Sequence, residues 1–269
     1  MSRQKNLKRN LLICLLAGSA VMYTLPLHAA TSVVANNALP TLPMVNGQIK
    51  DGYGFVTGGN NTNIVTDGLQ MNITQNDSNA AIKWGSFDVG GSATVNFDYT
   101  GKSDFNTLNY VNSASASQIY GTINAQHEGY NGNIFVINPA GVQIGPSAQI
   151  NVGSLYVSNK YLNESEFDDF NGSNINSLID TTKTANAELM SLGNINAANN
   201  VTFDGNRIVL DTDRVIITNH QNGKLNIKTT DTNNVVLGYE AYDENNGYTD
   251  TVDNEKSFNV TKVTIENGR

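Results

Sequence analysis

Cysteine is almost absent from this chain, which has one such residue, Cys14, in an apolar stretch near the amino terminus. Beyond that stretch the chain therefore has neither disulfide bonds nor thiol chemistry, and packing and backbone hydrogen bonds must hold the fold together. A chain without cross-links can also pass through a narrow pore in extended form. A fold that simply needs no disulfide explains the same absence equally well.

Histidine and basic residues are scarce as well. The chain has three histidines, and the two that follow the amino-terminal stretch, His127 and His220, are far apart in sequence, so a histidine-based metal site or catalytic triad is not indicated. Acidic residues outnumber basic ones by 24 to 16, which gives a formal net charge of −8. This balance argues against nucleic acid and anionic membranes as partners, because both bind basic patches.

The amino terminus has the pattern of a secretory signal peptide. Four basic residues precede an apolar run at residues 11–22, and small residues follow, ending in Ala29 and Ala30. We therefore predict a signal peptide over residues 1–30 that engages the Sec machinery and is cleaved near Ala29 or Ala30. The apolar run is too short to span a bilayer comfortably, and no later segment approaches about eighteen consecutive apolar residues.

Short β-branched and aromatic runs fill the rest of the chain, and helix signals are few. Most runs alternate with a period of two, and Gly, Asn, Asp, Ser and Thr bound them. The pattern predicts an all-β fold with closely spaced strands at residues 69–73, 81–84, 93–97, 118–123, 134–137, 142–144, 149–152, 201–203, 208–210, 215–217, 225–227 and 235–237.

Two all-β architectures fit this pattern. A sandwich or barrel would join its strands by tight hairpins, whereas a solenoid stacks short parallel strands in coils of about twenty residues. Residues 147–152, 193–198 and 223–227 share one pattern, in which an aliphatic residue and an Asn follow a small or polar lead. This repetition favours the solenoid. Asn would then occupy coil corners and form amide ladders along the stack, although an Asn-rich composition can also merely mark loops.

Two segments depart from the strand pattern. Residues 163–192 are acidic at first and carry helix-forming residues later, so we expect a helical or irregular excursion there. Residues 239–269 are polar and acidic and end in a strand-like run without a polar cap, so a longer native protein could continue from this point. We therefore divide the chain into a signal peptide (1–30), a β-helix domain (31–238) and a C-terminal extension or last coil (239–269).

The strongest local signal runs from residue 117 to 162 and closes with residues 155–159. In its core, residues 132–153, a strand, a turn and a second strand follow one another. The turn is Asn138-Pro139-Ala140-Gly141. Pro139 fixes φ and ends strand pairing, Gly141 permits a positive φ, and Asn138 can hydrogen-bond to its own backbone across the corner.

This turn resembles one in the secretion domain of the filamentous haemagglutinin and high-molecular-weight adhesin family, which is exported by two-partner secretion. That family has Asn-Pro-Asn-Gly followed by an aliphatic residue. Asn138, Pro139 and Gly141 match, and Val142 is the aliphatic residue. Ala140 departs from the usual Asn, which affects the role of that side chain but not the turn.

Two further elements of the same family occur in the same order. Its Trp-x-x-Phe element matches Trp84 and Phe87, which we expect mainly to pack, and residues 117–123 match the segment between it and the turn. The resemblance covers about residues 64–218. It implies a right-handed parallel β-helix with an N-terminal capping region and small elements outside the helix.

The resemblance also implies a function. Family members are recognised in the periplasm by an outer-membrane β-barrel transporter with POTRA domains, cross it unfolded and fold outside, so the protein would be secreted or held at the cell surface. Asn138, Pro139 and Gly141 would form the secretion motif. Because losing one turn hydrogen bond costs only about 1 kcal/mol, we expect the turn to matter more for export than for stability. A purely structural turn is the alternative.

Two other functions remain open beside this one. The first is a free-standing surface adhesin or matrix component that binds a host-cell glycan or protein. The second is a β-helix carbohydrate-active enzyme, for which the acidic pairs Asp168-Asp169 and Asp211-Asp213 are the only candidates, and solvated loop carboxylates explain them better. The oxygen-rich loop at residues 243–247 lacks the full spacing of a calcium site. We therefore assign no catalytic residue, cofactor or metal and do not expect an enzyme.

Overall fold

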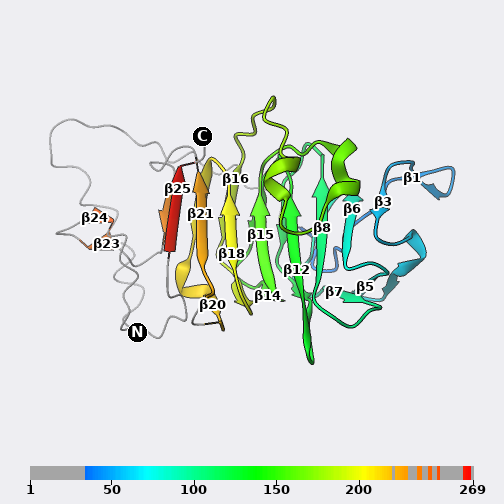
Figure 1. Cartoon of the computed structure of the whole chain (residues 1–269), viewed down its shortest axis with the longest axis horizontal. Helices are drawn as coiled ribbons and strands as arrows, with labels where there is room; N and C mark the ends of the chain where they lie inside the picture. The colour runs from blue at the N-terminus through cyan, green and yellow to red at the C-terminus, as the bar shows by residue number, and fades with distance from the viewer. Residues whose placement is uncertain are drawn as a thin grey trace. The chain divides into compact units, whose positions relative to one another are not determined.

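The computed structural model describes residues 34–219, 222–229, 235–237, 242–243, 247–248 and 263–267 (Figure 1). Side chains are described for residues 34–219 and 222–229. The predicted signal peptide with its cleavage near Ala29 and Ala30, and also His220, lie outside the described residues. Within the described part, no helix is long and apolar enough to cross a membrane.

Three β-sheets, which we call sheets 1, 2 and 3, form the body of the fold. Sheet 1 contains β4 (Ile64–Asp67), β5 (Gln70–Gln75), β7 (Thr94–Tyr99), β10 (Thr122–Asn124), β14 (Gln149–Val152), β17 (Asn194–Ala197) and β20 (Val215–Ile217). Sheet 2 contains β3 (Gly54–Thr57), β6 (Asn79–Trp84), β8 (Phe105–Val111), β12 (Tyr130–Ile137) with β11 (Gln126–His127) beside it, β15 (Ser154–Ser158), β18 (Val201–Asp204), β21 (Leu225–Thr229) and β25 (Val263–Asn267). Sheet 3 contains β9 (Ser117–Ile119), β13 (Val142–Ile144), β16 (Glu188–Ser191), β19 (Arg207–Leu210) and β22 (Val235–Leu237).

From β7 to β22 the chain visits the three sheets in a fixed order, from sheet 1 to sheet 2 to sheet 3, and then begins the next coil. Strands β14, β15 and β16 form one such coil, and β17, β18 and β19 form the next. Each strand of the second coil pairs in parallel with the strand of the same sheet in the first. This is a parallel β-helix, which confirms the predicted solenoid and excludes the sandwich (Figure 1). Stacked partners are 20 residues apart at Asn199 and Asn219 but 28 apart at Asn96 and Asn124, so the earlier coils exceed the expected length.

Antiparallel strands end the stack on its N-terminal side. Strand β3 pairs antiparallel with β6 at the edge of sheet 2, and β4 pairs antiparallel with β5 at the edge of sheet 1. A short hairpin, β1 (Met44–Val45) and β2 (Gln48–Ile49), and the 3-10 helix η1 (Asn61–Asn63) belong to the same region. These elements form the expected cap, because they interrupt the parallel ladder that would otherwise present an open edge.

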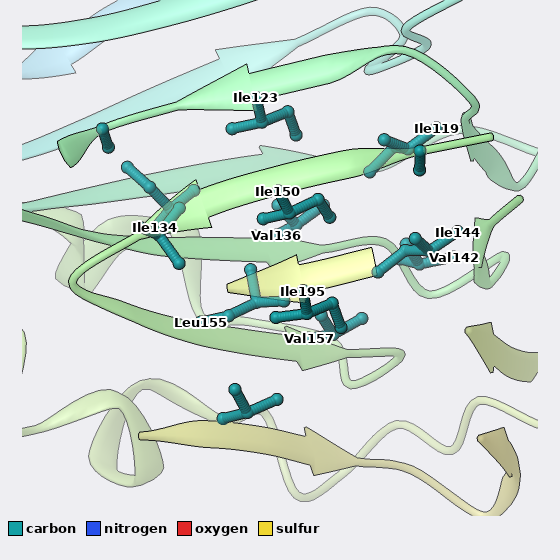
Figure 2. Close-up of a cluster of buried hydrophobic side chains, with 14 of the residues drawn as sticks. Ile119, Ile123, Ile134, Val136, Val142, Ile144, Ile150, Leu155, Val157 and Ile195 are labelled. Carbon is teal, nitrogen blue, oxygen red and sulfur yellow. The ribbon is translucent and has the colours of Figure 1, made fainter. Parts of the chain in front are cut away.

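Aliphatic side chains from all three sheets fill the interior (Figure 2). The period-two pattern of each strand sends every second residue inward. Parallel register then places these residues above one another in successive coils, as with Ile123, Ile150 and Ile195 of sheet 1. All three are buried. Burial of one such side chain contributes about 1.5–3 kcal/mol, so the stacks are a main source of stability.

Asparagine ladders run along two of the sheets, as predicted. In sheet 1 each amide nitrogen donates to the amide oxygen of the preceding coil, at 2.9, 3.1 and 2.9 Å, along Asn72, Asn96, Asn124 and Asn151. In sheet 2 the same arrangement joins Asn79, Asn106 and Asn133 at 2.8 and 3.0 Å. A planar amide carries both donors and an acceptor, so each Asn can satisfy the coil on either side.

The expected excursion leaves the helix between β15 and β16 and covers the outer face of sheet 2. It contains two 3-10 helices, η2 (Glu164–Asp169) and η3 (Ile175–Leu178), and no α-helix. Its Phe167, Phe170 and Leu178 are buried in a second apolar cluster together with outward-facing residues of sheet 2, namely Ala81, Leu108, Tyr110, Phe135, Ile137 and Tyr156. The remaining elements are η4 (Thr212–Arg214) and the hairpin of β23 (Tyr242–Asp243) and β24 (Gly247–Tyr248).

The ladder of sheet 1 should contribute measurably to stability. Asn124→Ala removes both of that residue's ladder bonds, and we expect a loss of about 1–2 kcal/mol of unfolding free energy, or roughly 3–6 °C in melting temperature for a domain of this size. Asn37→Ala, at an exposed position outside the ladders, should stay within about 1 °C. Equal melting temperatures for the two variants would show that the ladder is energetically neutral.

Candidate functional site

The Asn138-Pro139-Ala140-Gly141 turn connects β12 of sheet 2 to β13 of sheet 3. The amide nitrogen of Ala140 donates to Asn138 Oδ1 at 3.0 Å, and the amide nitrogen of Gly141 donates to the carbonyl oxygen of Asn138 at 2.8 Å. The backbone bond that we expected from Asn138 is therefore present. Pro139 lies two residues beyond Ile137, the last residue of β12, where its missing N–H removes no ladder bond.

The Asn138 side chain also binds the preceding coil. Its Nδ2 donates to the carbonyl oxygen of Ser115 at 2.9 Å and lies 3.1 Å from Ser117 Oγ, while its backbone nitrogen donates to the carbonyl oxygen of Ser158 in the following coil at 3.0 Å. The residue is 0 % exposed. Removing the side chain would take one partner from the buried hydroxyl of Ser117, which costs about 1–3 kcal/mol if that group is left unsatisfied, and would also break the two part-buried bonds to Ser115 and Ala140. The turn is thus worth more to stability than the single hydrogen bond on which our expectation rested.

Gly141 is required at its position for two reasons. Its φ is +104°, a conformation that L side chains rarely adopt, and a Cβ there would lie 2.7 Å from the carbonyl oxygen of Glu188 in the next coil. Its own carbonyl oxygen accepts from the backbone nitrogen of Ser117 in the preceding coil at 3.0 Å. The turn therefore lies where three coils meet.

Sequence reasoning missed a second asparagine at the same corner. Ile137 and Ser158 are register partners, so Asn159 takes the position of Asn138 in the next coil. Asn159 is also 0 % exposed, and its Nδ2 donates to the carbonyl oxygen of Ala187 at 2.5 Å. Nothing in the local sequence marked it, because no proline follows and the equivalence depends on the register between coils.

Trp84 and Phe87 are both buried in the core. Their rings make an edge-to-face contact with centroids 5.8 Å apart, and Trp84 Nε1 donates to Asn109 Oδ1 at 3.0 Å. Trp84 pairs in register with Val111, the last residue of β8. Ile137 pairs with Tyr110, the residue before Val111, so Val111 has the position that Asn138 takes one coil later. Trp84 and the turn therefore lie at the same corner of the helix, two coils apart, which is about 10 Å.

The remaining candidate residues do not form a site. His127 Nε2 lies 2.8 Å from the carbonyl oxygen of Phe97, and its ring stacks on Tyr130. Asp168 and Asp169 belong to η2, and the Asp211 carboxylate caps η4. Among the residues that the structure describes, no group of three or more His, Cys, Asp or Glu side chains could hold a metal ion.

A capped parallel β-helix with a buried Asn-Pro-x-Gly corner defines the class of this protein, that of parallel β-helix domains. More specifically, the model of the TPS secretion domain, the domain of two-partner secretion, matches residues 49–269, and the chain belongs to this family. The family is one of secretion domains and not of enzymes, and exoproteins that carry it are secreted to the extracellular space or the cell surface.

Two curated relatives come from Haemophilus influenzae, and both are described as heme/hemopexin-binding protein. One, from strain Rd, is 32% identical over 151 residues, or 55% of this chain, and the other is 37% identical over 93 residues, or 35% of this chain. The chain matches only 16% and 9% of the lengths of these relatives. Among solved structures, the HMW1 secretion domain from Haemophilus influenzae aligns with 70% of this chain and 44% of its own, at 22% identity and a TM-score of 0.47.

The two demands on Gly141 can be separated by a matched pair of variants. Gly141→Ala adds backbone strain of about 1–3 kcal/mol and a clash with the Glu188 carbonyl that costs about 1–3 kcal/mol more. Gly129 also has a positive φ, +86°, but no atom lies within 4 Å of a Cβ built there. We therefore expect Gly141→Ala to lose clearly more unfolding free energy than Gly129→Ala in chemical denaturation. Equal losses would show that the next coil yields to the added methyl group.

Proposed function

We propose that this domain directs the export of an exoprotein through a cognate outer-membrane transporter that recognises the chain before it folds. Membership of the secretion-domain family supports the proposal. The observation that carries it is the burial of the motif: Asn138, Pro139 and Gly141 are all buried in the folded domain. A transporter cannot contact these side chains once the coils have closed, so recognition has to precede folding.

Folding outside the cell then makes the movement of the chain through the transporter directional. The Asn138 side chain hydrogen-bonds to the preceding coil, and its backbone nitrogen hydrogen-bonds to the following one. Emerged coils that close around this residue bury their aliphatic stacks, and the chain cannot slide back without exposing them to water again. The free energy of folding thus opposes backward movement without any need for a nucleotide.

Several finer features belong to the same proposal. The transporter would contact the unfolded chain through POTRA domains in the periplasm, after the Sec machinery has moved the chain across the inner membrane by the signal peptide of residues 1–30. The mature protein would end up outside the cell or on its surface. Adhesion to a host-cell glycan or protein would be the downstream purpose.

The proposal can be tested by comparing Asn138→Ala with Asn159→Ala. Both variants remove a fully buried amide at the same corner of successive coils, so both should lower the unfolding free energy, by about 1–4 kcal/mol. Only Asn138 lies in the motif. With the transporter co-expressed, we expect Asn138→Ala to reduce the extracellular protein strongly and Asn159→Ala to reduce it only as far as its melting temperature falls.

Periplasmic and extracellular fractions should be measured together with the melting temperatures of the refolded domains. Accumulation of Asn138→Ala in the periplasm at a stability matched to Asn159→Ala supports recognition of the motif. If the two variants lose secretion equally at equal stability, the motif is a structural turn and the recognition role is wrong.

A further inference from the structure

Asn-Gly pairs are places where the backbone can attack an asparagine side chain, because Gly has no Cβ to crowd its own nitrogen. The chain has six such pairs, which begin at Asn46, Asn131, Asn171, Asn222, Asn246 and Asn267, and side chains are described for the first four. We infer that Asn46, at the tip of the hairpin of β1 and β2, is a site of spontaneous deamidation in the folded domain, and that the fold protects the other three described pairs. This modification is independent of export.

The tip of the hairpin is open to solvent. Asn46 and Gly47 connect Val45 to its register partner Gln48, and both are exposed. Their φ angles are +51° and +80°, and no atom lies within 4 Å of a Cβ built at Gly47. Among the described residues, neither the Asn46 side chain nor the Gly47 backbone nitrogen has a hydrogen-bond partner. Both reacting groups are therefore free.

The turn must open before these groups can meet, because closing the ring changes the left-handed backbone at Asn46. The hairpin resists opening only weakly. Strands β1 and β2 have two residues each and pair with each other alone, and one further bond, from the backbone nitrogen of Lys50 to the carbonyl oxygen of Pro43 at 2.8 Å, closes its base. A hairpin of this size is marginally stable by itself, so the tip can open while the three main sheets stay intact.

The reaction needs only water. The Gly47 backbone nitrogen gives its proton to water or hydroxide and attacks Cγ of Asn46, so that a C–N bond forms, the side-chain nitrogen leaves as ammonia and a succinimide ring results. Water then adds to either ring carbonyl and opens the ring, which leaves an aspartyl or an isoaspartyl residue. The product adds one negative charge to a chain with a net charge of −8, beside the exposed side chains of Met44 and Val45.

Two of the other pairs have no free nucleophile. In the pair that begins at Asn131, the glycine nitrogen donates to the carbonyl oxygen of Ala125 at 2.6 Å. In the pair that begins at Asn222, it donates to the carbonyl oxygen of Asn219 at 2.8 Å. Each of these bonds must break before the nitrogen can attack.

In the remaining pair the side chain is held instead. Asn171 Oδ1 accepts hydrogen bonds from the backbone nitrogen and the hydroxyl of Ser173, at 3.1 and 2.8 Å. The amide cannot turn toward the following nitrogen without losing them. Asn171 and Asn222 are as exposed as Asn46 by class, so hydrogen bonding and not exposure distinguishes the hairpin tip.

Peptide mapping by mass spectrometry can follow all four pairs in one sample of the purified chain, kept folded at mildly alkaline pH. We expect Asn46 to deamidate at least about fivefold faster than each of the other three, because one hydrogen bond of typical strength slows the attack by about that factor. In denaturant the four rates should become similar, because Gly supplies the attacking nitrogen in each pair. The modified chain should keep its melting temperature within about 2 °C, because the hairpin pairs with no other strand.

Asn46→Gln is the control for the site, because its longer side chain would have to close a larger ring, and it should abolish the modification at the hairpin. The product at Asn46 should include the isoaspartyl form, which arises only through the ring. The inference is overturned if any of the other three pairs deamidates as fast as Asn46 in the folded chain, if the product is aspartyl alone, or if the four rates differ as much in denaturant. None of these outcomes bears on secretion, which the Asn138 and Asn159 variants test separately.

Discussion

The register between successive coils is the constraint on which the rest of this structure depends. Parallel backbone hydrogen bonds hold each coil level with the one before it, so residues at equivalent positions become direct neighbours although they are 19 residues apart in sequence at Glu188 and Arg207 and 47 apart at Val142 and Leu189. One alignment therefore produces both the aliphatic stacks inside and the asparagine ladders outside. A slip of one residue would turn both inside out at once, and the register is strongly specified for that reason.

On the outer face of sheet 2, the outward-facing side chains are apolar where the excursion packs on them. Leu108, Phe135 and Tyr156 point outward and are apolar where the excursion packs on them. Thr202 and Asn226, outward positions of later coils, are polar and lie outside this apolar cluster. Lys83 and Glu164 form an ion pair that fastens the excursion to β6. The excursion is thus part of the packing of this face.

Local patterns predicted the strands and the turn, because both depend on residues close in sequence. They also predicted the ladders, because the amide group of Asn can donate and accept hydrogen bonds along a stack of coils. The sequence did not predict the register between coils, because coil lengths vary and the excursion of residues 163–187 lies before β16, which nevertheless stacks on β13. For that reason the sequence could not show that Trp84 and Asn138 share a corner, or that Asn159 is the counterpart of Asn138. The excursion itself was expected, but its acidic and helix-forming residues make 3-10 turns and not an α-helix, because the segment is anchored by buried aromatics at short intervals.

The burial of Asn138, Pro139 and Gly141 connects the fold to export. The contacts of the turn reach the coils on both sides: Ser115 and Ser117 lie in the preceding coil, and Ser158 and Glu188 in the following one. The turn can therefore reach its buried state only when both neighbouring coils have formed, and it stays accessible as long as either is missing. In the export that we propose, a chain held unfolded would expose the turn, and a chain that has folded outside the cell would no longer offer it as a binding site. A transporter that binds the turn before folding would then be released when both neighbouring coils close.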